Sequence, residues 1–115
     1  MSEFSKVVVI TGGSSGIGTE MARYFAGNGW DVAITFSGNK AGAESTVAAV
    51  EAQGQRAFMM QCDVGYKDQV DGFLDTVTLQ LGLPQLLVNN AGVQTWASFL
   101  DLEEDDWDRT IRTNL

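Results

Sequence analysis

The chain of 115 residues is the size of one small domain with one hydrophobic core, and its content of 44% hydrophobic and 19% charged residues is that of a globular protein. Fifteen acidic residues oppose seven basic ones, and the resulting net charge of -8 argues against a nucleic acid or an anionic membrane as partner. Because histidine is absent and cysteine occurs once, the composition excludes an internal disulfide, a His/Cys zinc site and a His-dependent nucleophile.

The first predicted element is a strand over Lys6–Thr11, a β-branched run that stops at two glycines. The run is too short to cross a membrane and follows no leader-like pattern, so we expect a cytoplasmic location. Similar runs predict strands over Asp31–Phe36, Arg56–Cys62 and Leu86–Asn89. Such runs are typical of strands covered on both faces of a parallel sheet. Cys62 is expected to be a small buried residue without a chemical role.

Between the strands, the hydrophobic period changes to that of helices. A helix follows the first strand, a second spans Lys40–Gln53, and a third precedes the last strand, with glycines 29, 54 and 82 expected to end them. The apolar faces are predicted to be Ile17, Met21, Tyr24 and Phe25 in the first helix, Ala43, Val47 and Val50 in the second, and Val70, Phe73, Leu74, Val77 and Leu81 in the third.

The alternation of strands and helices predicts the fold class. Right-handed crossovers between such elements produce a doubly wound parallel α/β sheet with helices on both faces. A further helix is predicted from about Asp101, with Trp107 and Ile111 on its apolar face. Since no linker, repeat or low-complexity tract interrupts the pattern, residues 1–115 are predicted to form one domain.

The glycine-rich segment TGGSSGIG, residues 11–18, connects the first predicted strand to the first helix. A diphosphate binds well at such a junction because free backbone N–H groups and the positive end of the helix dipole meet there. Gly12 allows the tight turn, Gly16 lets the backbone approach the phosphates, and Gly18 lets the helix pack closely on the sheet. The alternative is an ordinary glycine-rich turn with a serine cap. The flanking strand and helix favour a dinucleotide site, whose backbone donors need no lysine.

Three motifs resemble those of the short-chain dehydrogenase/reductase family, in the family's order. TGGSSGIG fits the pattern T-G-x-x-x-G-x-G, Asp63-Val64 follows the third strand, and NNAG, residues 89–92, follows the fourth. Asn114 lies where the family has the asparagine of its catalytic tetrad. The resemblance covers the whole chain and implies a Rossmann-type fold, cut off before the family's Tyr-x-x-x-Lys segment. The chain looks most like bacterial glucose 1-dehydrogenases, and 3-oxoacyl reductases are the alternative.

The resemblance implies an NAD(P)-dependent oxidoreductase that moves a hydride between nicotinamide and a small alcohol or carbonyl substrate, such as a sugar or a 3-oxoacyl thioester. It implies that Asp63 and Val64 contact adenine, and that Asn90, Ala91 and Gly92 form the wall beside the adenine ribose. We expect no metal, and a homo-oligomer as the complete protein. The predicted cofactor-binding residues are Gly12, Ser14, Ser15, Gly16, Ile17, Gly18, Ser37, Asp63, Val64, Asn90, Ala91 and Gly92.

The residues after the second strand bear on the choice of cofactor. An acidic residue there commonly accepts the ribose 2′-OH of NAD, whereas the 2′-phosphate of NADP needs a position without negative charge. Residues 35–40, TFSGNK, contain no carboxylate, and Ser37, Asn39 and Lys40 are candidate phosphate donors. The alternative is that these residues form only a polar turn and a helix cap. We therefore predict a preference for NADP, or the use of both cofactors.

The family's proton-transfer motif, Y-x-x-x-K, has no match in the chain. Tyr24 is followed four residues later by Asn28 and Tyr66 by Val70, so neither tyrosine fits it. Of the tetrad, Asn114 is present, and its implied role is to hold a water and the active-site lysine. We expect no dehydrogenase activity from this chain alone. The alternative function is a non-catalytic module or regulator that binds NADP(H).

Overall fold

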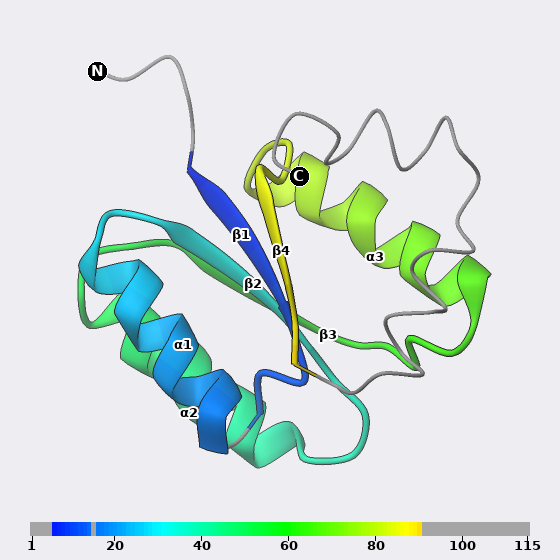
Figure 1. The fold of residues 1–115 in the computed structure, drawn as a ribbon, viewed down its shortest axis with the longest axis horizontal. Coiled ribbons are helices and arrows are strands. Elements are labelled where there is room, and N and C mark those ends of the chain that lie inside the picture. The colour runs from blue at the N-terminus through cyan, green and yellow to red at the C-terminus, as the bar shows by residue number, and fades with distance from the viewer. Residues whose placement is uncertain (1–5, 15, 91–115) are drawn as a thin grey trace.

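The computed structural model describes residues 6–14 and 16–90, which form one parallel β-sheet with helices on both faces (Figure 1). The four strands and the second helix begin and end within two residues of their predicted bounds. In chain order, the elements are β1 (Val7–Thr11), α1 (Gly16–Gly27), β2 (Asp31–Phe36), α2 (Lys40–Glu51), β3 (Ala57–Gln61), α3 (Lys67–Gln80) and β4 (Leu86–Asn89).

The order of the strands is β3-β2-β1-β4, and each neighbouring pair is parallel. From β1 the chain passes through α1 and α2 to β2 and β3 on one side, and then returns through α3 to place β4 on the other side of β1. Helices α1 and α2 cover one face of the sheet and α3 covers the opposite face (Figure 1). The predicted doubly wound α/β fold is confirmed. In such folds ligands bind at the carboxyl ends of the strands, where the strand order reverses, and here that place lies between β1 and β4.

The central strand β1 is buried on both faces, as its sequence predicts. Val7 and Val9 pack into a cluster with Phe73 of α3. Val8 and Ile10 point the opposite way, into a second cluster that includes side chains of α1 and α2. Two hydrophobic layers therefore hold β1 and fix the position of the loop that follows it.

Strand β3 is less buried than its sequence suggests. Its first four residues are half-buried and Gln61 is exposed, so the prediction of a strand covered on both faces is wrong here. The reason is its place in the sheet. Among the described residues β3 pairs with β2 alone, and the other side of the strand is an edge.

The predicted apolar face of α1 is wrong at two of its four positions. Ile17 is 70% exposed and Tyr24 is 66% exposed, while Met21 and Phe25 are partly buried. The fully buried side of the helix consists instead of small residues, Gly18, Ala22 and Ala26. Small residues bring the helix axis close to the sheet, which leaves no room for large side chains directly beneath it.

The other two helices bury the faces that were predicted. In α2, Ala43 and Val50 are buried and Val47 is partly buried. The helices end two or three residues before the glycines expected to stop them. The helix predicted from Asp101 lies outside the described residues. Across residues 6–14 and 16–90, no helix combines the length and apolar character that crossing a membrane requires. The residues predicted for the apolar face of the third helix, in α3 and directly after it, are all buried: Val70, Phe73, Leu74, Val77 and Leu81.

Candidate functional site

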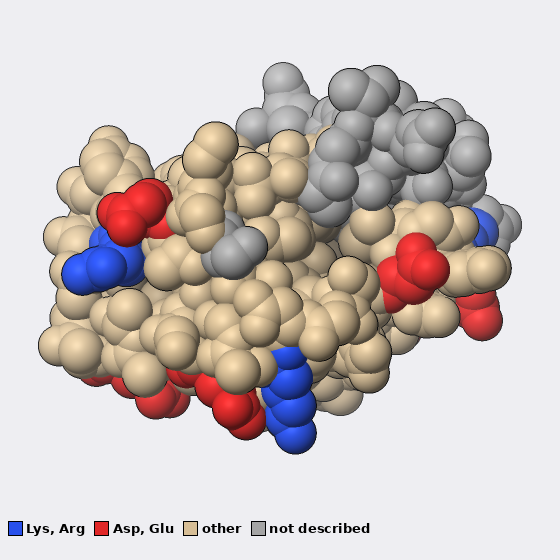
Figure 2. Space-filling model, turned by 90° about the horizontal axis from the view of Figure 1, so that it is seen from below, with Lys and Arg blue, Asp and Glu red and all other residues tan. Residues whose placement is uncertain are grey.

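The predicted site residues that the structure describes gather at the carboxyl ends of the four strands. Ser15, Ala91, Gly92 and Asn114 lie outside the described residues. In Figure 2, which views the molecule from this end, the described atoms in the middle of the face are uncharged, and charged side chains lie to the left and right of it and along the lower edge. The gathered residues are Gly12, Ser14, Gly16, Ile17 and Gly18 after β1, Ser37 after β2, Asp63 and Val64 after β3, and Asn90 after β4.

Two glycines give the loop after β1 its shape. Gly12 and Gly16 have φ angles of 69° and 56°, in the left-handed region that favours glycine. A Cβ atom on Gly16 would meet no atom within 4 Å, so the space above it is open. Helix α1 begins at Gly16, and the first N–H groups of any helix lack an acceptor inside it. In α1 these donors belong to Gly16, Ile17 and Gly18, beside the positive end of the helix dipole.

The start of this loop is bonded to the end of β2. The Gly12 N–H donates to the side-chain oxygen of Thr35 (3.1 Å), and the Gly13 N–H donates to the carbonyl of Thr35 (3.0 Å). A Cβ on Gly13 would lie 2.5 Å from Cγ2 of Ile34, so the loop also packs closely on β2. The Gly12 and Gly13 amides therefore hold the loop in place, and the donors that remain for a ligand begin further along it.

The same loop is bonded to β4 on its other side. The Thr11 hydroxyl donates to Oδ1 of Asn89 (3.0 Å) and accepts the backbone N–H of Asn90 (2.9 Å). Nδ2 of Asn90 donates to the carbonyl of Gly12 (3.0 Å). Asn90 thus acts on the loop directly, and the two strands that flank β1 hold the loop between them.

A pocket of about 180 Å³ lies beside the loop and is lined by the ends of β2 and β3. Its lining includes Cys62, where burial first, and then the nearby Asp63 carboxylate, raises the pKa of the thiol to about 11. The thiol is therefore neutral near pH 7, as expected of a buried structural cysteine. The lining residues are Gly12, Thr35, Phe36, Ser37, Cys62, Asp63 and Val64.

Amide side chains fix the walls of this pocket. The Asp63 N–H donates to Oε1 of Gln69 in α3 (2.7 Å), and the Asp63 carboxylate accepts the Gly65 N–H (2.9 Å). Nε2 of Gln61 donates to the carbonyl of Ser37 (2.7 Å). Neither glutamine was among the predicted site residues, and both act through backbone atoms.

Asn39 has a structural role after β2. Its side-chain oxygen accepts the Gly42 N–H (2.9 Å) as the N-cap of α2, and Nδ2 donates to the carbonyl of Ser14 (3.4 Å). The alternative interpretation of this residue as a helix cap is therefore confirmed. Ser37 and Lys40 are both exposed, and they remain as the candidate side chains for a 2′-phosphate.

Residues 6–115 match the family described as short chain dehydrogenase. The chain belongs to this family. It is 35% identical over 113 residues to 3-oxoacyl-(acyl-carrier-protein) reductase FabG of Staphylococcus aureus, and this alignment covers 98% of this chain and 46% of the relative. It is 36% identical over 110 residues to 3beta-hydroxysteroid dehydrogenase 1 of Eggerthella lenta, covering 96% and 42% of the two chains. The chain thus spans less than half the length of these short-chain dehydrogenase relatives.

Solved structures agree with the family. Acetoin dehydrogenase from Enterobacter cloacae has a TM-score of 0.72 at 29% identity, with 91% of this chain and 46% of that one covered. A Burkholderia cenocepacia protein crystallised with bound NADP has a TM-score of 0.71 at 35% identity, covering 74% and 33%. A Serratia marcescens short-chain dehydrogenase/reductase variant, with a TM-score of 0.82 at 23% identity over 92% and 51% of the two chains, is similar in fold.

Proposed function

We propose that the chain is the cofactor-binding part of an NAD(P)-dependent oxidoreductase that acts on an alcohol or carbonyl compound. The observation that carries the proposal is the loop after β1, which is bonded to both neighbouring strands and opens at Gly16 onto free space beside the start of α1. Family membership and the NADP bound to one relative support it.

The residues present fit a dinucleotide. The N–H groups at the start of α1 and the Ser14 hydroxyl would hold the diphosphate. The pocket between β2 and β3 would take the adenine, with Asp63 and Val64 at its edge. Nicotinamide supplies the hydride-transfer chemistry when bound. Within this chain the proposed task of the residues is to bind and orient it, because neither tyrosine fits the family's Y-x-x-x-K pattern.

The test is a fluorescence titration with NADPH of the chain and of Gly16→Val. A valine at a φ of 56° is strained, and its side chain would enter the open space above the loop. We expect binding to be lost. Gly72→Val, a change at an uncrowded position of α3, is the matched control and should still bind. An unaltered chain that binds neither NADPH nor NADH would overturn the proposal.

We further propose that NADP is preferred over NAD. No carboxylate lies in residues 35–40, Ser37 is exposed and lines the pocket, and Lys40 is exposed at the start of α2. Ser37→Asp places a negative charge where a 2′-phosphate would bind, so it should weaken NADPH binding on the order of tenfold or more and leave NADH binding unchanged or improved. Equal affinity of the unaltered chain for both cofactors would instead indicate dual use.

For the complete protein, we propose a 3-oxoacyl thioester as substrate, because the Staphylococcus aureus relatives are named 3-oxoacyl-(acyl-carrier-protein) reductases. The alternative is a sugar such as glucose, which the resemblance in sequence suggested. Assays of the complete protein with NADPH and a 3-oxoacyl thioester, and with NADP and glucose, distinguish the two. NADPH binding without turnover of any alcohol or carbonyl would support the non-catalytic alternative. A cytoplasmic location and a homo-oligomeric state stay predictions.

A further inference from the structure

Thr35 is a polar residue at the end of β2 that is buried to the same degree as the apolar core. Its exposed fraction is 2%, and buried hydroxyls require hydrogen-bond partners. Its partner is the Gly12 N–H at 3.1 Å, in a segment 23 residues away in the sequence. Its carbonyl accepts the Gly13 N–H. Thr35 therefore accepts hydrogen bonds from the first two backbone N–H groups of the loop.

The loop has reason to need such a contact. Residues 12–16 are Gly-Gly-Ser-Ser-Gly, and glycine loses more conformational freedom on ordering than any other residue. N–H donors bind a diphosphate more strongly when the loop that carries them is ordered before binding, because binding then loses less conformational entropy. Asn90 restrains the carbonyl of Gly12 from the β4 side, and Thr35 restrains its N–H from the β2 side.

We propose that Thr35 is a positioning residue for the cofactor, acting through Gly12 to fix the loop before the diphosphate binds. This inference rests on the proposed function, since it concerns affinity for the same dinucleotide. Thr35 would then contribute to cofactor affinity through the hydrogen bond between its hydroxyl and the Gly12 N–H.

The experiment compares two valine substitutions at buried threonines. Thr35→Val keeps the shape of the side chain and removes the acceptor of the Gly12 N–H. Thr46→Val is the matched control. Thr46 is 1% exposed, and its hydroxyl bonds to the carbonyl of Gly42 (3.1 Å) and to Oγ1 of Thr19 (2.9 Å), and not to the amides of Gly12 and Gly13. We expect both variants to unfold at a lower temperature, and Thr35→Val alone to raise the Kd for NADPH on the order of tenfold.

Two further readouts separate positioning from general stability. Thr35→Ser keeps the hydroxyl and should restore the NADPH affinity, and hydrogen exchange of the Gly12 amide should be faster in Thr35→Val than in Thr46→Val. If Thr35→Val does not fold, Thr35→Cys, which has a weaker acceptor, takes its place with the same expected direction. Equal NADPH affinity in the Thr35 variant, the Thr46 variant and the unaltered chain would overturn the inference and leave the proposed function intact. Absence of binding by the unaltered chain would overturn both.

Discussion

Gly18, in the first turn of α1, lies directly against Asn90 at the end of β4: a Cβ atom on Gly18 would be 2.8 Å from Nδ2 of Asn90. The same atom would be 2.9 Å from Cα of Gly13 and would also collide with the carbonyl of Gly12. Because that Nδ2 atom donates to the Gly12 carbonyl, the helix, the loop and β4 meet at one crowded point. Any side chain at Gly18 would therefore have to displace backbone atoms of the loop.

A methyl group at Gly18 should therefore separate α1 from the loop. We expect Gly18→Ala to lower the free energy of unfolding by about 1–3 kcal/mol, the usual cost of overpacking, and to weaken NADPH binding. Gly72→Ala is the control. It lies in α3 with open space around it, and should raise stability by about 0.5–1 kcal/mol as a helical glycine replaced by alanine. Urea unfolding measures both changes, and equal stability of the two variants would contradict the crowding.

The hydrogen bond from Asn90 to Gly12 is expected to contribute to both stability and NADPH binding. In Asn90→Asp a carboxylate oxygen replaces the donor and faces the Gly12 carbonyl, so two acceptors meet. We expect weaker NADPH binding and a free energy of unfolding lower by about 1–3 kcal/mol. Asn28→Asp adds the same charge at an exposed asparagine whose Nδ2 donates to the Tyr24 carbonyl, at the other end of α1. It should leave the NADPH affinity unchanged, and a matching loss there would point to net charge as the cause.

Much of this architecture follows from the sequence, because hydrophobic period and glycine position are local properties. The runs of β1 and β2, the buried face of α3 and the turn at Gly12 were predicted on that basis. The buried face of α1 was not, since a period argument weights large apolar residues, whereas close packing on the sheet selects Gly18 and its small neighbours.

The polar contacts of the site are harder to predict. Thr35 bonds to Gly12 across 23 residues, and Gln61 and Gln69 act on backbone atoms of the pocket wall. These pairings depend on strand register and on the direction of each side chain, which composition and spacing do not determine. One signal was present. A threonine inside an otherwise apolar buried strand needs a hydrogen-bond partner, and the nearest donors in a doubly wound sheet belong to the loop after the central strand.

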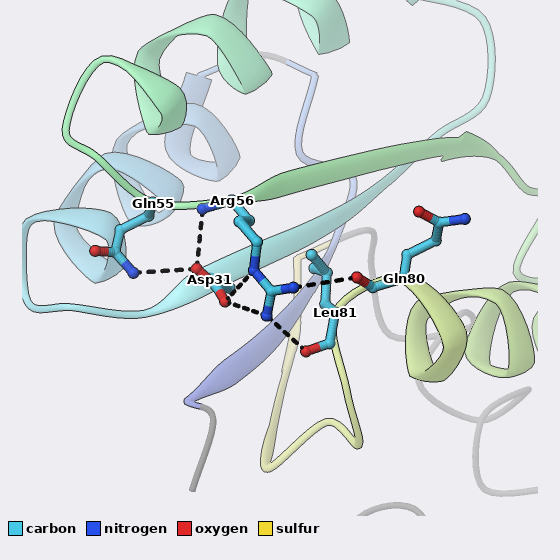
Figure 3. Close-up of polar contacts among 5 residues, drawn as sticks. All are labelled: Asp31, Gln55, Arg56, Gln80 and Leu81. Atoms are coloured by element: carbon cyan, nitrogen blue, oxygen red, sulfur yellow. Dashed lines mark hydrogen bonds and ion pairs between the residues drawn. The ribbon is translucent and has the colours of Figure 1, made fainter. Parts of the chain in front are cut away.

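At the amino ends of the strands, away from the loop after β1, a cluster of polar contacts around Arg56 is expected to affect stability alone. Nε and Nη2 of Arg56 donate to Oδ2 of Asp31 (3.0 and 2.8 Å), and the guanidinium also donates to the carbonyl of Leu81 (2.9 Å), as Figure 3 shows. The Arg56 side chain thus connects the start of β2, the segment before β3 and the residues after α3. We expect Arg56→Met to lower the free energy of unfolding by about 1–2 kcal/mol, with NADPH affinity unchanged because the loop after β1 lies at the other end of the strands.

Arg23→Met is a matched control for this change, since the side chains of Arg23 and Arg56 are both 57% exposed. Arg23 has a long contact of 3.9 Å to the exposed Glu20, and such surface pairs contribute little. We expect its loss to change stability by less than about 0.5 kcal/mol in urea unfolding. If the two variants were equally stable, the bonds of Arg56 to Asp31 and Leu81 would have no net effect.

The thiol of Cys62 is buried beside Asp63, and burial first, then the Asp63 carboxylate, raises its pKa from 9.0 to about 11. At pH 8 the thiolate fraction is then roughly one hundredth of that of a thiol with the ordinary pKa, so iodoacetamide should react at least about a hundredfold more slowly with the folded chain than with the unfolded one. The rate should rise with pH up to about pH 11. Bound NADPH should slow it further, since Cys62 lines the pocket.

The same shift sets the sign of a pH effect on stability. A group whose pKa is raised by folding stabilises the folded state fully below its unfolded pKa, and this contribution is lost as pH rises through the folded value. The free energy of unfolding should therefore fall between about pH 9 and pH 11 by more in the unaltered chain than in Cys62→Ala, which has no thiol to ionise. All other ionisable groups are the same in both proteins, so the difference between their urea unfolding curves isolates Cys62. Parallel curves across this range would show that the thiol ionises as readily in the folded chain as in the unfolded one.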